Sequence, residues 1–201
     1  MIDKVVLLDK AITLSEVYGN NLDTVVYTQG CGLSARLRLE KLGFNTEGKT
    51  FAISTYEDLG NNRISNESKN WRNDNRAGLI WLDDLYELNN DENFIYPLID
   101  QANLFIEQSI LDPNIQVEDQ FFVSAIMGRA YKYTQDLKYI DFMIDHVLNS
   151  PLMRNDGIYL HSKIAEYPWG RGNGFAAYGS IEAITYTPDD YPRKNELIEK
   201  N

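Results

Sequence analysis

The stretch QFFVSAIMGRAYKY, residues 120–133, is apolar on nearly every face of the helix that it predicts. A helix that has no polar face is buried on all sides in a globular protein. The earlier stretch AGLIWLDDLYEL, residues 77–88, has the same character. The sequence therefore predicts two buried inner helices, which other helices have to cover.

An amphipathic helix is predicted after each inner helix, at 93–109 and at 137–149. The two helix pairs also share a pattern of residues at a constant offset of 45 positions. A period of this length is typical of a repeated helical hairpin. The sequence thus predicts an all-α protein in which inner and outer helices alternate, as in an α/α toroid or a solenoid. The matching positions are Tyr86 and Tyr131, Asp91 and Asp136, and Ile95 and Ile140.

The remaining elements are predicted from apolar spacing and turn residues. A helix is expected over 4–18 and another over 33–42, with Gly43 as its C-cap. The segment 45–73 is rich in Gly, Asn, Ser and charge and predicts a long connection. A turn at 155–157 precedes a short extended piece at 158–160. A helix-like run extends from Phe175 to Ile184, and Pro192 is placed to begin a last outer helix.

Composition excludes several classes of partner. The 201 residues are 43% apolar, which is enough for one sizeable core. A net charge of −11 without a basic stripe argues against nucleic acid. No apolar run approaches the roughly 20 residues of a membrane span, so no membrane partner is expected. The acidic start does not resemble a signal peptide, which predicts a cytoplasmic protein. Cys31 is the only cysteine, so no intrachain disulfide can form.

Two aspartates precede the two inner helices at the same 45-residue offset. Asp74 comes before the first inner helix and Asp119 before the second. Equivalent positions of a toroid or solenoid lie at the same end, so both carboxylates are expected at one rim. The alternative is that each is an N-cap, the commonest use of aspartate before a helix.

The stretch YPWGRGNGF, residues 167–175, is the second candidate site. Arg171 offers a planar fork of donors suited to a carboxylate, and the start of the following helix favours an anion. Trp169 and Phe175 are expected to form apolar walls. The plainer alternative is a loop and helix cap with a solvated Arg171. Nearby His161 is either an acid/base or hydrogen-bonding group or a structural histidine, and His146 is expected on a solvated helix face.

Five segments of the sequence carry a resemblance to a known family, and they follow one another along the chain in the same order as in that family. The chain resembles glycoside hydrolase families 88 and 105, the unsaturated glucuronyl and rhamnogalacturonyl hydrolases. The most specific match is WGRGNG at 169–174, which is similar to the family's Trp-x-Arg-Gly-Asn-Gly hallmark. The other matching segments are YTQG with SARL at 27–37, DNRAG at 74–78, EDQFF at 118–122 and GIYLH at 157–161. The chain departs from the family at Phe175, where a Trp is usual, and at Ser162-Lys163 after the histidine.

The resemblance implies an (α/α)6 toroid built from six helical hairpins. About three and a half hairpins are recognisable here, so a single catalytic domain over 1–201 is expected, truncated and lacking its C-terminal hairpins. It also implies an enzyme acting on a small oligosaccharide, with no cofactor and no metal. No His, Cys and Asp cluster with metal-ligand spacing is present in the sequence.

The implied reaction removes a terminal Δ4,5-unsaturated uronic acid by hydrating its vinyl ether. The resemblance makes Asp119 the general acid/base, and Asp74 at the same rim is expected to raise the pKa of Asp119. Arg171 is the candidate for the substrate carboxylate and His161 for a sugar hydroxyl or the incoming water. Trp169, Asn173 and Phe175 complete the expected substrate-binding set.

Two other functions remain open at this stage. Another α/α-toroid sugar enzyme, a lyase or an epimerase, fits the same fold, although two histidines are few for an epimerase. A non-catalytic helical-repeat binding module would use Asp74 and Asp119 only as caps.

Overall fold

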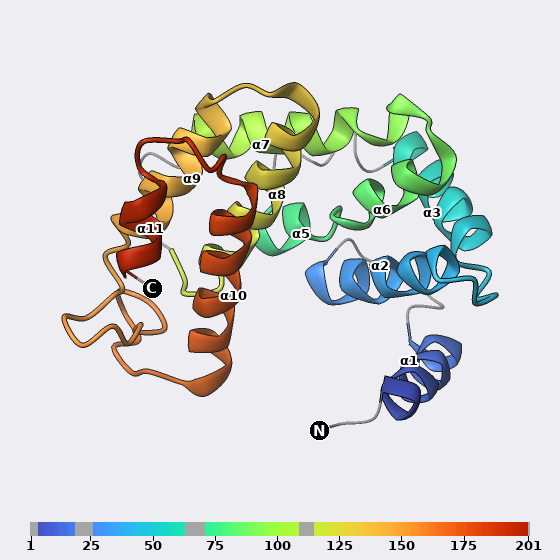
Figure 1. Cartoon of the computed structure of the whole chain (residues 1–201), viewed down its shortest axis with the longest axis horizontal. Helices are drawn as coiled ribbons and strands as arrows, with labels where there is room; N and C mark the ends of the chain where they lie inside the picture. Colours follow the sequence, from blue (N-terminus) through green and yellow to red (C-terminus); the bar gives the residue numbers. More distant parts are fainter. Residues whose placement is uncertain (1–3, 19–25, 63–70, 109–114, 201) are drawn as a thin grey trace. The chain divides into compact units, whose positions relative to one another are not determined.

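The computed structural model describes residues 4–18, 26–62, 71–108 and 115–200 (Figure 1). Within these ranges the chain is helical apart from turns and loops, one short 3-10 helix and two isolated β-bridges. The all-α fold of helical hairpins is confirmed. The chain divides into two compact units, Met1–Pro97 and Leu98–Asn201, and each is described by itself.

The first unit is built around α2. It contains α1 (Lys4–Val17), α2 (Tyr27–Lys41), α3 (Gly48–Asn62), α5 (Asn73–Ala77), α6 (Trp81–Asn89) and the 3-10 helix η2 (Glu92–Phe94). Helix α2 packs against α3, α5 and α6. Leu33 and Leu37 of α2 and Leu82 and Leu85 of α6 are fully buried, because they form the apolar stripes on which these helices meet.

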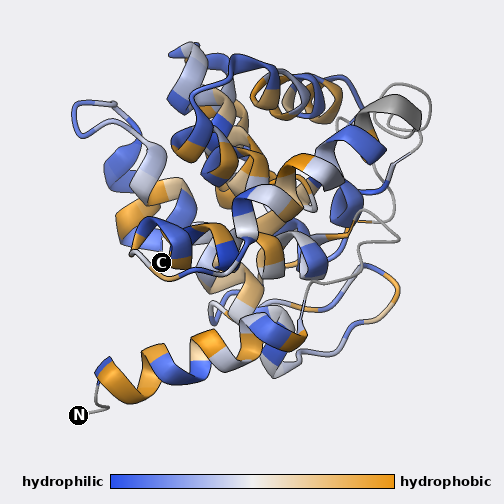
Figure 2. Ribbon diagram, turned by 90° about the vertical axis from the view of Figure 1, so that its right-hand side faces the viewer, coloured by the Kyte–Doolittle hydropathy of each residue, from blue (hydrophilic) through white to orange (hydrophobic). Residues whose placement is uncertain are grey.

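Ion pairing adds to this apolar contact between α2 and α6. Arg38 Nε lies 2.9 Å from Asp84 Oδ1, and the Ser34 hydroxyl donates to the same carboxylate. The close approach of the α2 and α5 ends requires glycine, since a Cβ on Gly30 would lie 2.3 Å from the Gly78 carbonyl oxygen. Helix α1 is different: Figure 2 shows apolar and polar residues alternating along it, and Val5 and Val17 are strongly exposed.

Several expectations for this unit are confirmed and others are wrong. Helix α1 is confirmed. The C-cap of α2 is Leu42, and the predicted cap residue Gly43 follows it with a φ of 89°. The second helix begins at Tyr27 instead of Leu33. The long connection is wrong, because α3 occupies 48–62 within it and buries Ala52 and Leu59. The predicted inner helix 77–88 is interrupted after Ala77, and α6 begins at Trp81.

The second unit is built around α8 (Asp119–Thr134), in which every residue from 119 to 130 is buried. Helix α8 packs against α9 (Lys138–Leu148) and α10 (Gly170–Tyr186), and α11 (Lys194–Lys200) packs against α9 and α10. Helix α7 (Tyr96–Gln108) leads into this unit. The inner helix predicted at 120–133 and the outer helix predicted at 137–149 are thereby confirmed.

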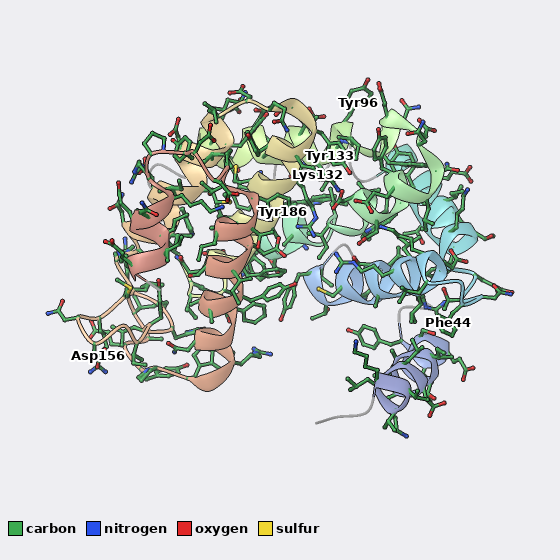
Figure 3. The ribbon with its side chains drawn as sticks, viewed as in Figure 1. Phe44, Tyr96, Lys132, Tyr133, Asp156 and Tyr186 are labelled. Carbon is green, nitrogen blue, oxygen red and sulfur yellow. The ribbon has the colours of Figure 1, made fainter. Side chains whose placement is uncertain are left out.

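Helices α8 and α10 approach closely at glycines. A Cβ on Gly179 of α10 would lie 2.2 Å from the Gln120 carbonyl oxygen of α8. Towards the other end of this contact, the ring of Tyr186, labelled in Figure 3, lies against Gly128. The Arg129 guanidinium carbon is 5.8 Å from the centroid of the same tyrosine ring. Glycine is therefore required at Gly179, which meets the α8 backbone, and at Gly128, which meets the Tyr186 ring.

The chain between α9 and α10 forms the loop that reaches the start of α8. The turn at 155–157 is confirmed, with Gly157 at φ 81°, and Asp156 lies at its tip (Figure 3). Bridges join Met153 to Tyr159, within the extended piece predicted at 158–160, and Gln116 to Ser162 outside it. Helix α10 begins at Gly170, so the RGNG segment is the first turn of the helix and the loop expected there is wrong. None of the described helices is long and apolar enough to cross a membrane.

Candidate active site

Asp119 is the first residue of α8 and is only 5% exposed. Its Oδ2 accepts a hydrogen bond from the Gln116 N–H at 2.8 Å. This bond holds the carboxylate against the backbone of the segment that precedes the helix. The N-cap position belongs to Glu118, which makes no side-chain cap bond. Asp119 therefore secures the loop before the helix and does not act as a conventional N-cap.

The segment before Asp119 is held against the segment that carries His161. The Val117 N–H donates to the His161 carbonyl at 2.9 Å, next to the bridge between Gln116 and Ser162. This short backbone pairing brings the start of α8 and His161 to one junction, although 42 positions separate Asp119 and His161 in the sequence.

The His161 ring is fixed by two aromatic side chains and faces Glu118. It stacks on Tyr167 with a centroid distance of 5.6 Å and an angle of 13°. It also meets Trp169 edge-to-face at 5.5 Å. His161 Nε2 lies 3.9 Å from Glu118 Oε1, which is too far for a hydrogen bond. Tyr167 was missed from sequence, although it lies within the segment that carries the hallmark.

Trp169 and Arg171 form a platform at the start of α10. The Arg171 guanidinium carbon lies 4.3 Å from the centroid of the Trp169 ring, while the arginine is exposed. The indole rests on Gly172, where a Cβ would come within 2.2 Å of Trp169 Nε1. The indole therefore holds an exposed guanidinium, which suits recognition of a carboxylate.

Asn173 is engaged with backbone groups in this structure. Its Oδ1 accepts from the Tyr159 N–H at 2.9 Å, and its Nδ2 donates to the carbonyls of Tyr159 and Trp169 at 3.0 and 3.1 Å. These bonds tie α10 to the extended piece that leads to His161. Phe175 lies 5.8 Å from the Phe122 ring, within an aromatic cluster at the α8–α10 contact.

Asp74 belongs to the first unit. It is the second residue of α5, and its Oδ1 lies 3.7 Å from Arg72 Nε. The other expected site residues, including Asp119, His161 and Arg171, all lie in the second unit. The placement of Asp74 beside Asp119 stays a prediction, as do the expected effect on the pKa of Asp119 and the substrate contacts.

His146 corrects an expectation from the sequence. It was expected on a solvated face, but its Nε2 is buried, and no described residue gives this atom a hydrogen-bond partner. The ring hydrogen-bonds to the Asp119 backbone, and burial lowers the pKa of His146 to about 4. The available signal was its place in α9 beside the buried Met143 and Val147.

Three polar atoms around His161 are buried without a hydrogen-bond partner among the residues that the structure describes. They are Glu118 Oε2, His161 Nδ1 and Trp169 Nε1. The described parts of the chain contain no group of three or more His, Cys, Asp or Glu placed to hold a metal ion. The site thus offers carboxylates, an imidazole, an indole and one exposed guanidinium.

Comparison with known proteins supplies the fold. No family model matches the chain, and no curated protein matches it. Among solved structures, the chain is similar to Polysaccharide Lyase BACCELL_00875, with a TM-score of 0.75 and 15% sequence identity. The match covers 98% of this chain and 65% of that one. At this identity the similarity shows that the two chains share an α/α-toroid type of fold. It gives no information about activity.

Proposed function

We propose that this chain is part of a carbohydrate-active enzyme that removes a terminal Δ4,5-unsaturated uronic acid from oligosaccharides by vinyl-ether hydration. The observation that carries the proposal is the junction at the start of α8. There the buried Asp119 follows Glu118, which faces His161, and His161 contacts the Trp169–Arg171 platform. These residues come from the segments that resemble the unsaturated uronyl hydrolases.

In this reaction Asp119 acts first as an acid and then as a base. Its carboxyl proton goes to C4 of the double bond, and positive charge develops at C5 and the ring oxygen. Asp119 then takes a proton from the water whose oxygen bonds to C5. The resulting hemiketal opens and releases the aglycone, so one water is consumed for each glycosidic bond cleaved.

The other side chains bind and orient the substrate. Arg171 is placed to pair with the uronate carboxylate, and the Trp169 indole supports the guanidinium by a cation–π contact. His161 is held by Tyr167 and Trp169, so its ring keeps one orientation towards a hydroxyl or water. Phe175 is expected to extend the apolar wall next to Phe122.

A second candidate is suggested by the similar solved structure, which is described as a polysaccharide lyase. A lyase acting on a uronate polymer removes the C5 proton and expels the sugar at C4, which creates the same double bond. His161 would be the base, with Arg171 neutralising the carboxylate. The hydrolase therefore consumes the conjugated double bond, whereas the lyase creates it.

One assay separates these functions, because the conjugated uronate absorbs ultraviolet light. Unsaturated disaccharides from pectin and glycosaminoglycans are given to the protein in one arm, and intact uronate polymers in the other. The hydrolase predicts falling absorbance in the first arm, and a lyase predicts rising absorbance in the second. We expect Asp119→Asn to reduce the hydrolase rate by about a hundredfold or more.

Asp156→Asn is the matched control, because Asp156 is an exposed carboxylate at the tip of the 155–157 turn. It should keep the wild-type rate. Full activity in Asp119→Asn would contradict the assigned role. An unchanged absorbance in both arms, with disaccharide binding intact, would favour the non-catalytic binding module.

A further inference from the structure

Glu118 has a carboxylate oxygen with an unmet hydrogen-bonding capacity inside the candidate site. The residue is 8% exposed, and its Oε2 has no hydrogen-bond partner among the described residues. Its other oxygen faces His161 at 3.9 Å, beyond hydrogen-bonding distance. Leaving a buried carboxylate oxygen unsatisfied is costly, so a ligand group that donates a hydrogen bond to it would be stabilised.

The neighbouring atoms define the chemistry of that group. Trp169 Nε1 is a donor only, and His161 Nδ1 is a donor or an acceptor according to its tautomer. Both are buried without a partner within the described ranges, and both belong to rings in contact with each other. A hydroxyl matches this set, because it donates one hydrogen bond and accepts others. A second carboxylate does not match, since Glu118 would repel it.

We propose that Glu118 is a specificity-determining residue that accepts a hydrogen bond from a free ring hydroxyl of the uronate. The inference rests on the proposed function and adds the orientation of the sugar. The substrate carboxylate is repelled from the Glu118 side and directed towards the exposed Arg171. An unsaturated uronate in glycosidic linkage has ring hydroxyls only at C2 and C3, so one of these two is the group recognised.

The test begins with the wild-type protein and three probes. They are the methyl glycoside of the unsaturated uronic acid and its 2-deoxy and 3-deoxy derivatives, and the readout is kcat/KM from the loss of ultraviolet absorbance. We expect one deoxy probe to lose about tenfold to a hundredfold in kcat/KM, the effect of removing a hydrogen bond to a charged group. Equal rates for all three probes within about twofold would overturn the inference.

The same probes are then given to Glu118→Gln, whose carboxamide keeps the shape and loses the charge. Because the carboxamide oxygen still accepts a hydrogen bond, the variant should lose part of this factor on the parent probe and show a smaller penalty on the sensitive deoxy probe. An undiminished deoxy penalty in Glu118→Gln would mean that another group reads the hydroxyl, and the inference fails. A merely structural Glu118 would lower the rate on every probe equally.

Controls separate folding and function from recognition. Glu166→Gln removes an exposed carboxylate in the loop that carries Tyr167, and it should keep the wild-type probe preference. If Glu118→Gln loses its helical circular dichroism, Glu118→Asp replaces it and should give a partial penalty. Failure of the proposed function looks different, because the parent probe itself would then not be turned over by the wild-type protein.

Discussion

His146 connects the outer helix α9 to the backbone of Asp119, and its burial makes stability depend on pH. Burial holds the pKa of His146 at about 4 in the folded protein, against 6.5 for an ordinary histidine. Between these values the unfolded chain binds more protons than the folded one. The contribution of the neutral ring is therefore fully present above pH 6.5 and is lost as the pH falls towards 4.

We expect this loss to be at most about 3 kcal/mol, from 1.36 kcal/mol per pKa unit. Urea unfolding of wild type and His146→Gln at a series of pH values across this window measures it. Carboxylates also titrate in this pH range. The informative quantity is therefore the difference between the two proteins in how the free energy of unfolding changes with pH. A variant that retains the full wild-type slope would show that His146 is not the group responsible.

The site residues were predictable where they belong to a sequence motif. Their contacts were not predictable where they depend on how distant segments of the chain fold back on one another. Asp119, His161 and Arg171 were expected in the site, and the structure places them in one unit. The engagement of Asn173 with the Tyr159 backbone was not expected. It depends on the chain reversal between these residues, for which the local sequence gives no signal.

Elements were predictable where burial is complete and less so where packing overrides composition. The continuous apolar run of α8 predicted its position to within a residue at each end. Helix α3 was missed because its Gly, Asn, Ser and Thr residues have low helix propensity. Its buried residues Ala52, Thr55 and Leu59 recur at helical spacing, and contact with α2 and α6 stabilises the helix.

The α8–α10 contact predicts opposite effects for two glycines of one helix. A Cβ at Gly179 would lie 2.2 Å from the Gln120 carbonyl oxygen, so Gly179→Ala must push the two backbones apart. We expect a loss of about 2 kcal/mol or more in the free energy of unfolding. At Gly174 a Cβ meets nothing within 4 Å, and Gly174→Ala should stabilise the helix by about 0.5–1 kcal/mol.

Chemical denaturation of both variants beside the wild type tests this pair. Each change adds the same methyl group and gains the same helix propensity, so the comparison isolates the close approach of α8 and α10. Two variants of equal stability would mean that the helices separate freely at Gly179.

At the scale of the whole chain, hairpin alternation was predictable because inner and outer helices bury their residues differently. The similarity to the solved lyase extends over 98% of the chain, so the alternation runs through both units. The single-domain organisation of 1–201 stays a prediction. Sequence periodicity reports which residues are buried but not which helices share a compact unit, and the division at Pro97 lies within α7.

The net charge of the whole chain opposes the local attraction of Arg171 for an anionic substrate. A charge of −11 repels a uronate over distances at which Arg171 has little influence. The Debye length is about 30 Å at 0.01 M salt and about 10 Å at 0.1 M, so added salt screens the long-range repulsion first. The Arg171 contact is short-ranged and partly survives.

We therefore expect kcat/KM for an unsaturated uronyl disaccharide to rise by about twofold or more over this range of salt concentration. The methyl ester of the same disaccharide is the control, because it carries no charge at the uronate and its kcat/KM should stay constant. A kcat/KM that falls with salt for the free acid alone would show that short-range attraction at Arg171 outweighs the field of the whole protein.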